Sequence, residues 1–342
     1  MLRTLKHDFA SPRLLAVGAT SSGGSATVGI NSDDIYSATS GATGKITLTP
    51  RYGFRRAPIA VVTSDWTNIA ANGGGYVDST TAASSLTVGT HSGGAGAGDD
   101  GTLGAFILGY DEAEAVRSRK SAYTVTSNLC RPKLYLFKVT PATPAINIGN
   151  YHATLAKTGT GDVTITFNEP FGNGNVVAVA TPILGTRAEI HASATISTVR
   201  VKVFANGVAS DTPFYCVVMG QESLEKIGVQ QDRILVPGVK PRLVAGIITY
   251  SGGVPAVTVG TGAFTLTDTG TGDVAVAFTD AFAREPIVVA SPDTATLVTV
   301  KAAASATGVS LTHFNAAGSA ADPTSLHFMA FGFDDDSEYR YP

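Results

Sequence analysis

The chain has 342 residues and a formal net charge of only −3, with 24 Lys and Arg against 27 Asp and Glu. Charged residues make up 15% of it, against about 25% in an ordinary globular protein, and its abundant Gly, Thr, Val, Ala and Ser favour short strands and turns over helices. The charge balance excludes the electrostatic footprint of a nucleic-acid-binding protein, and two cysteines exclude a disulfide-stapled scaffold.

Residues 1–12 are predicted to form a polar N-terminal arm that carries Arg3 and Lys6. The arm has too few apolar residues to fold alone, so we expect it to become ordered against a neighbouring subunit. The run "LLAVGA" that follows is too short for the apolar region of a signal peptide. No stretch reaches the roughly 18 apolar residues that a membrane span needs. The sequence therefore predicts a protein made and folded in a cytoplasm, with no membrane insertion.

A domain-sized repeat organises the rest of the chain. The segment "TGTGDVTITFNEPF" runs from Thr158 to Phe171, and its near twin "TGTGDVAVAFTDAF" runs from Thr269 to Phe282, 111 residues later. A more diverged copy, "TGKITLTPRYGF", occupies Thr43 to Phe54. This period is well above the 20–50 residues of solenoid units, so each copy should have its own hydrophobic core.

Each copy is predicted to be an antiparallel β-sandwich of seven or eight strands. In "VTITF" the apolar residues alternate with threonine, which is typical of a strand with one buried face. The next segment, Val176 to Ala180 in the second copy, is apolar throughout and predicts a central strand covered on both faces. Turn residues recur about every 8–12 residues, the spacing of a sandwich or barrel. The predicted fold class is all-β, with three tandem jelly-roll-like sandwiches of about 105 residues.

The same pattern predicts the boundaries of the domains and linkers. Each linker holds charged and helix-forming residues, which predicts one helical turn. The predicted segments are the arm 1–12, sandwich 13–110, linker 111–128, sandwich 129–220, linker 221–238, sandwich 239–333 and an acidic C-terminal tail 334–342.

The glycine spacing in "TGTGD" superficially suggests a phosphate-binding loop. Such a loop needs the amides of a helix N-terminus to face the anion. Here the motif precedes a strand, so we predict a turn that begins the strand.

The sequence predicts no catalytic residue, cofactor or metal site. None of the six histidines has metal-ligand spacing, and a structural role is expected for His327 in its predicted strand. The acidic runs "GDD" and "DDD" lack the alternating oxygen ligands of a calcium loop. No G-x-S-x-G elbow occurs, and the repeats bring no Ser, His and Asp together.

Cys130 and Cys216 are the only cysteines. They fall before the first strand and within the last strand of the second copy, which can be neighbours in a sandwich. A disulfide is therefore geometrically possible, whereas a cytosolic compartment favours free thiols.

Trp66 and an arginine-rich turn are the candidate partner contacts in the first copy. Trp66, the only tryptophan, follows the apolar strand; packing in the core is one reading and a ligand platform is the other. Arg51, Arg55 and Arg56 surround one turn, which is either solvated or docks on an acidic partner.

The copies differ in charge. Residues 1–127 hold 10 cationic and 10 acidic residues, residues 128–237 hold 9 and 7, and residues 238–342 hold 5 and 10. Different surfaces suggest different neighbours, and the linkers are long enough to separate the copies. The sequence therefore predicts an elongated row of three sandwiches.

The pattern "TGTGDVTITFNEPF…VVAVATP", closed by a segment such as "GSAADPTSLHFMAFG", resembles β-sandwich modules in virion proteins of tailed bacteriophages. Such modules occur in tail fibres and capsid-surface proteins and are somewhat similar to H-type lectin domains. The resemblance covers most of residues 13–333, once per copy. It implies a structural or binding role in a virion, with a homo-oligomer or lattice contacts.

Three functions remain open at this point. The first is a capsid decoration or cement protein whose partners are the major capsid protein or other virion proteins. The second is a tail-fibre or receptor-binding protein that recognises a cell-surface glycan. The third, a glycan-degrading enzyme, has no catalytic signature behind it. The chain lacks the heptads or Gly-x-y runs of a fibre shaft, and its long loops are rich in Gly, Ala and Ser, which favours decoration.

Overall fold

The computed structural model shows an all-β protein, which confirms the predicted fold class. Every named element of the described part is a strand. The structure describes residues 12–22, 24–30, 35–42, 44–50, 53–54, 57–64, 74–82, 85–91, 101–110, 132–148, 152–172, 176–183, 188–205, 207–221, 241–260, 263–293, 299–315 and 317–333. The predicted arm, both linkers and the acidic tail lie outside these ranges.

The strands fall into three sets along the chain. The first set is β1 (Pro12–Ser22), β2 (Ser25–Ile30), β3 (Ile35–Ala42), β4 (Lys45–Pro50), β5 (Ile59–Ser64), β6 (Gly74–Ala82), β7 (Ser85–His91) and β8 (Thr102–Tyr110). The second is β9 (Pro132–Thr140), β10 (Ala145–Ile148), β11 (Ala153–Gly159), β12 (Asp162–Phe167), β13 (Val177–Pro182), β14 (Ala188–Ala194), β15 (Thr198–Ala205), β16 (Val208–Ala209) and β17 (Phe214–Gln221). The third is β18 (Pro241–Ser251), β19 (Val254–Val259), β20 (Phe264–Gly270), β21 (Asp273–Phe278), β22 (Ile287–Asp293), β23 (Thr299–Ser305), β24 (Gly308–Phe314) and β25 (Ser325–Phe333).

Each set repeats one strand order. In the first repeat the order β2-β1-β8-β5 makes one four-stranded sheet, which we call the inner sheet, and β3-β4-β7-β6 makes the other, the outer sheet. The inner sheets of the other repeats are β10-β9-β17-β13 and β19-β18-β25-β22. Their outer sheets are β11-β12-β15-β14, with β16 beside β15, and β20-β21-β24-β23. All pairings within a repeat are antiparallel.

The core of each repeat lies between its two sheets. Alternation of buried and less buried residues along β4, β12 and β21 turns one face of each outer sheet towards the inner sheet. In the second repeat, the rings of Tyr135, Phe137 and Phe167 stack in this space, and Phe171 meets Tyr135 and Phe167 edge to face. The phenylalanine that ends the repeated motif packs where a glycine leaves room: a Cβ on Gly220 would lie 2.5 Å from the Phe171 ring.

The "TGTGD" motif forms the predicted turn. Gly159 pairs with Asp162 across the β11–β12 hairpin, so Thr160 and Gly161 make the loop. Gly161 has a φ of 66°, and a Cβ there would lie 2.4 Å from the carbonyl oxygen of Val203. Only glycine fits this left-handed, crowded position.

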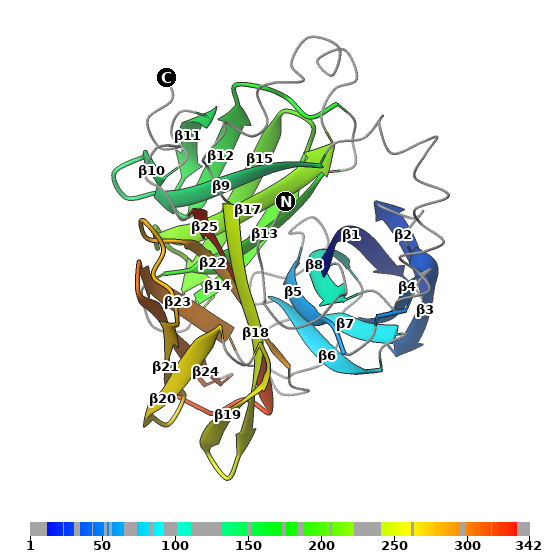
Figure 1. Ribbon diagram of the computed structural model, residues 1–342. Helices are drawn as coiled ribbons and strands as arrows, with labels where there is room; N and C mark the ends of the chain where they lie inside the picture. Colours follow the sequence, from blue (N-terminus) through cyan, green and yellow to red (C-terminus); the bar gives the residue numbers. More distant parts are fainter. Residues whose placement is uncertain are drawn as a thin grey trace.

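The three repeats surround a common centre, so the predicted elongated row is wrong. Figure 1 shows the repeats as three lobes, with strands of each inner sheet directed towards the middle. β5 contacts β25, β13 contacts β8, and β22 contacts β17, so each repeat contacts both others in the same way. The parallel pairings of Ser64 in β5 with His191 in β14, and of Val77 in β6 with Asp293 in β22, also join an inner sheet to the outer sheet of another repeat.

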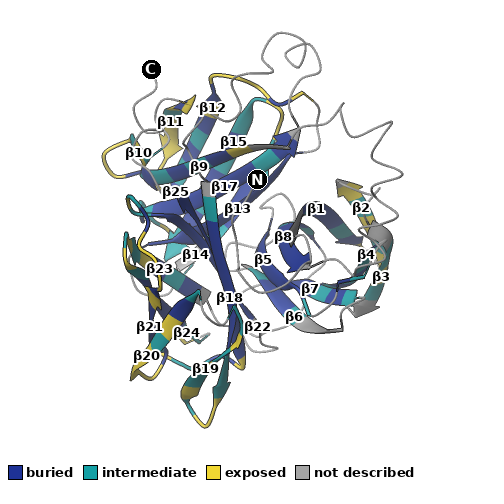
Figure 2. Cartoon of the chain, in the orientation of Figure 1, coloured by how far each residue is buried: buried dark blue, intermediate teal, exposed yellow. Residues whose placement is uncertain are grey.

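The uniformly apolar strands explain this arrangement. Every residue of β5 and of β13 is buried, as Figure 2 shows in dark blue near the centre. These strands were predicted to be central strands. Instead, each is the last strand of its own inner sheet, and the neighbouring repeats cover its second face.

Candidate functional site

The sequence-predicted contact residues Arg3, Lys6, Arg51, Arg55, Arg56 and Trp66 all lie outside the described residues, so their roles stay predictions. Cys216 is a free and completely buried thiol whose pKa is raised by that burial. Cys130 lies outside the described part.

A ring of three hydroxyls closes the contact between the repeats. Thr63 Oγ1 accepts the N–H of Ala180 at 2.9 Å and donates to the Ala180 carbonyl at 3.3 Å. Thr181 Oγ1 likewise accepts the N–H of Ala290 at 3.0 Å and donates to the Ala290 carbonyl at 3.5 Å.

Ser291 Oγ accepts the N–H of Val62 at 2.8 Å and donates to the Val62 carbonyl at 3.1 Å. The first repeat thus holds the second, the second holds the third, and the third holds the first. All three residues are at most 2% exposed. Because they occupy one position in three equivalent strands, the chain has a pseudo-threefold axis, and we call this region the junction.

Apolar side chains fill the rest of the junction. Val61, Val179 and Val217 belong to the same buried cluster as the core of the third repeat. Phe106 and Phe331 meet edge to face across the first and third repeats, with ring centroids 6.5 Å apart. Hydrophobic burial therefore holds the repeats together, while the hydroxyls fix their register.

Two buried histidines also link repeats. His327 Nδ1 accepts the N–H of Ala60 at 3.1 Å, and His191 Nδ1 shares a hydrogen bond of 2.7 Å with Ser64 Oγ. Burial lowers the pKa of His327 to about 3, and burial together with the charge of Lys202 lowers the pKa of His191 to about 4. Both imidazoles are neutral and structural near neutral pH, as expected for His327.

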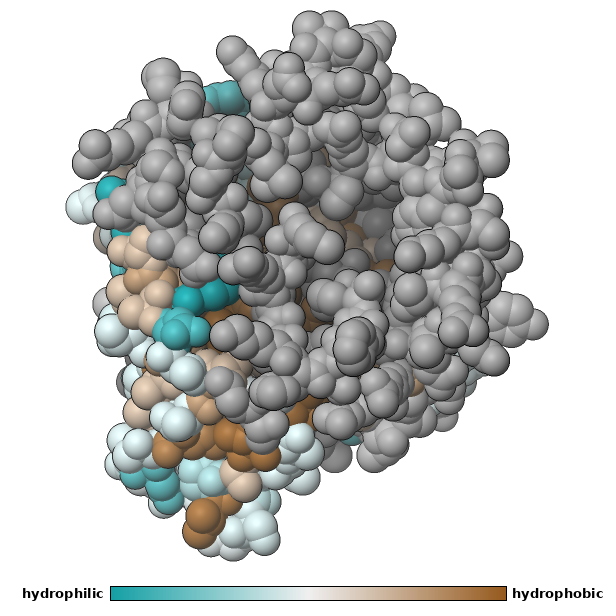
Figure 3. All heavy atoms as spheres, in the orientation of Figure 1, coloured by the Kyte–Doolittle hydropathy of each residue, from teal (hydrophilic) through white to brown (hydrophobic). Residues whose placement is uncertain are grey.

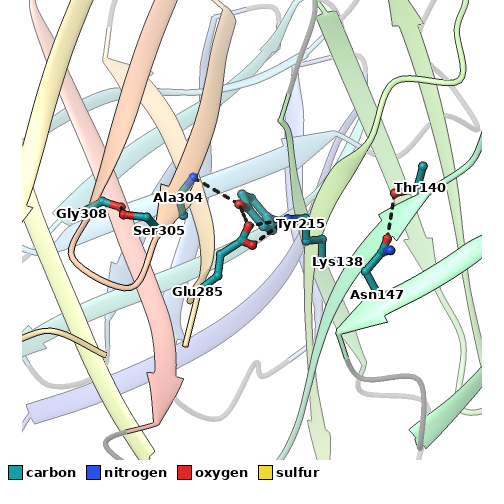
Figure 4. A network of polar contacts seen from close by, with 8 residues as sticks. All are labelled: Lys138, Thr140, Asn147, Tyr215, Glu285, Ala304, Ser305 and Gly308. Carbon is teal, nitrogen blue, oxygen red and sulfur yellow. Dashed lines mark hydrogen bonds and ion pairs between the residues drawn. The ribbon is translucent and has the colours of Figure 1, made fainter. Parts of the chain in front are cut away.

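The contact between the second and third repeats has an additional polar clasp, seen in Figure 4. Lys138 Nζ lies 2.7 Å from both carboxylate oxygens of Glu285, and the Tyr215 hydroxyl donates to the same carboxylate. The Tyr215 oxygen also accepts the N–H of Ala304 at 3.2 Å. Burial and the Glu285 carboxylate raise the pKa of Tyr215, which keeps its hydroxyl protonated.

The clasp does not recur at the other two contacts. The strand pairings place Gly18 and Gly104 in the first repeat, and Ile247 and His327 in the third, where the second has Lys138 and Tyr215. The three contacts therefore share the hydroxyl ring but differ in their other chemistry.

The contacts between the repeats that the structure describes hold the fold together. No group of three His, Cys, Asp or Glu among the described residues is placed to hold a metal ion. In the described part there is also no helix long and apolar enough to cross a membrane. Sequence reasoning missed the junction, although its signal was present: Thr63, Thr181 and Ser291 each follow an apolar run at the same position of their repeat.

Comparisons with known proteins add nothing to this picture, because no family model, no curated protein and no solved structure matches the chain.

Proposed function

We propose that the chain is a non-enzymatic structural protein of a phage virion, which decorates or cements the capsid by binding its outer shell. The closed junction carries the proposal. One chain buries the apolar outer faces of its own three inner sheets, so it reaches a trimer-like body without partners.

A body with pseudo-threefold symmetry suits a surface with local threefold symmetry. Three related modules on one rigid body can each contact one of three shell subunits, and each further contact is then intramolecular and raises avidity. The shell provides many such positions because it is built from repeated copies. The pattern that resembles virion modules supports the same location.

The surface of the described residues has few exposed apolar side chains. Only four large apolar side chains in the described ranges are exposed, and they lie in separate places: Leu134, Ile196, Val208 and Val254. Figure 3 shows mixed and mostly pale hydropathy colours on the described surface of the third repeat. The buried, neutral histidines are unsuited to proton transfer with an external substrate.

Electron microscopy of purified particles, labelled with an antibody against the chain, tests the proposal. We expect label on the head and, in a reconstruction, one chain at each occupied position of local threefold symmetry. Label on the tail would favour the receptor-binding alternative. Particles free of the chain would refute a virion role altogether.

A further inference from the structure

Strand β5 of the first repeat is held by a buried histidine from each of the other two repeats. His327 of the third repeat accepts the N–H of Ala60, and His191 of the second repeat shares a hydrogen bond with the hydroxyl of Ser64. Both histidines are at most 1% exposed. Each contact that the first repeat makes therefore contains an imidazole.

The contact between the second and third repeats has no histidine at the equivalent positions. The second repeat has Tyr215 where the third has His327. The third repeat has Lys301 where the second has His191, because each is paired opposite the partner of the residue that begins β21 or β12. The clasp of Lys138, Glu285 and Tyr215 holds this contact instead (Figure 4).

The hydrogen bond of His327 requires a neutral ring. Because Nδ1 accepts the Ala60 N–H, the ring proton is on Nε2, which has no hydrogen-bond partner among the described residues. A second proton would have to bind Nδ1, where it would point at the Ala60 N–H and remove the acceptor. The closed contact between the third and first repeats is therefore incompatible with an imidazolium at this position.

The surroundings of His327 provide no charge that would stabilise an imidazolium. In its sheet the ring lies between Ile247 of β18 and Ser291 of β22, and β5 has no ionisable side chain. Burial alone lowers the pKa of His327 to about 3. Protonation of this ring is therefore favoured only after β5 has moved away and water has entered.

The surroundings of His191 disfavour a positive charge as well. Its sheet partner on β15 is Lys202, whose positive charge adds to the effect of burial and lowers the pKa of His191 to about 4. Ser64 and the edge-on ring of Phe204 are uncharged. The buried Nε2 of His191 has no hydrogen-bond partner in the described part of the chain, so the second N–H of an imidazolium would be unsatisfied.

The first repeat has a core of its own that does not depend on the junction. One buried cluster, which includes Val17, Leu48 and Val88, consists entirely of residues from the first repeat. Along β5, Ala60 and Val62 belong to this cluster, whereas Ile59 and Val61 belong to the cluster that spans the junction. Opening the junction would therefore expose one face of β5 and leave the sandwich of the first repeat packed.

We propose that the junction is an acid-operated switch, in which the first repeat separates from the other two as a folded module while the clasp keeps the second and third repeats together. In the open form both histidines are hydrated and take up protons near their ordinary pKa of about 6.5. The equilibrium constant for opening should then rise by up to about tenfold per pH unit for each histidine as the pH falls below 6.5. This inference goes beyond the proposed function and holds for the isolated chain.

Hydrogen–deuterium exchange with residue resolution, measured on the full-length chain at pH 7, 6 and 5, tests the switch. Exchange rates are corrected for the intrinsic effect of pH, which leaves the protection that structure provides. The N–H groups of Ala60, Val62 and Ala180 donate across the contacts of the first repeat, and that of Ala290 donates across the contact between the second and third. At pH 5 we expect the first three amides to lose protection together, to at least about tenfold below Ala290, while the amides of β4 and β7 stay protected.

A double variant and a matched control separate the two histidines from the rest of the chain. His191→Gln with His327→Asn keeps an acceptor at each position and removes both titrations, so the protection of Ala60 should become nearly independent of pH. His313→Asn is the control, because it removes a completely buried histidine that bonds to Gly272 within the third repeat. It should leave the pH dependence at Ala60 unchanged.

Three results would overturn the inference. Equal loss of protection at Ala60 and Ala290 would mean that the whole chain unfolds rather than opens. An unchanged pH dependence at Ala60 in the double variant, or an equal flattening of that dependence by His313→Asn, would mean that the two contact histidines do not control opening. If the double variant does not fold, the comparison of Ala60 with Ala290 in the parent chain decides by itself.

Discussion

At the scale of single residues, the junction depends on small hydroxyl side chains that each satisfy a backbone N–H and a backbone carbonyl of another repeat. The backbone groups of Val62, Ala180 and Ala290 are buried, and leaving a buried polar group unpaired costs about 1–3 kcal/mol. The hydroxyls therefore contribute most by preventing this loss.

Thr181→Val tests this role with almost no change of volume. The variant removes the partner of the Ala290 N–H, so the free energy of unfolding should fall by about 1–3 kcal/mol in urea titrations. Thr166→Val, at an exposed position of β12, is the control and should change it by less than about 0.5 kcal/mol. Equal effects of the two variants would contradict the role of the ring.

The buried histidines make stability depend on pH. In the folded chain the pKa values are about 4 for His191 and His313 and about 3 for His327, whereas an unfolded histidine titrates near about 6.5. Between these values only the unfolded chain binds the protons, so stability is full above pH 6.5 and falls as the pH drops, by up to about 1.4 kcal/mol per unit for each histidine. Asp162 and Asp211, with lowered pKa values, lose their stabilising contributions at still lower pH.

Urea unfolding at pH 7, 6 and 5 measures this slope. His327→Asn keeps an acceptor for the Ala60 N–H and removes one titrating group, so the slope between pH 6 and 5 should fall by about a third. A slope identical to that of the parent chain would show that His327 is not buried as a neutral group.

At the scale of elements, strands such as β5 and β13 have two buried faces, and each contact between repeats combines the shared hydroxyl ring with chemistry of its own. The clasp of Lys138, Glu285 and Tyr215 distinguishes the contact between the second and third repeats. It joins β9 and β17 to the segment before β22 and to β23, which are far apart in the sequence.

Tyr215→Phe should destabilise this contact. It removes the hydroxyl from Glu285 and leaves the Ala304 N–H unpaired, so we expect a loss of about 1–3 kcal/mol, visible as a lower Tm. Lys157→Met is the control because it breaks an ion pair at the edge of one repeat, where such pairs contribute about 0–1 kcal/mol. If the control were the more damaging change, the clasp would not stabilise the contact between repeats.

At the scale of the whole molecule, three similar modules form one body. Separating the modules in water is unfavourable, because it would expose the buried apolar faces of β5, β13 and their neighbours. The different net charges of the three repeats are therefore presented from one body in different directions, not along a row.

Small-angle X-ray scattering of the isolated chain measures this compactness. A compact chain of 342 residues should have a radius of gyration of about 20 Å. A clearly larger value that persists at low concentration would mean that the repeats separate in solution. It would then favour the elongated row of three sandwiches over the compact body.

The amino-acid sequence by itself determined the repeat, the β-class, the turn at Gly161 and the structural role of His327, because alternation and turn chemistry are local properties of the chain. Its candidate contact residues, such as Arg55 and Trp66, lie outside the described part.

Only the tertiary structure decided how the repeats are arranged. An apolar run such as β13 shows that both faces of a strand are buried, but it does not show what buries them: a second layer of the same repeat and a neighbouring repeat leave the same pattern. The closed ring of Thr63, Thr181 and Ser291 exists only when all three repeats meet, so no local pattern could reveal it.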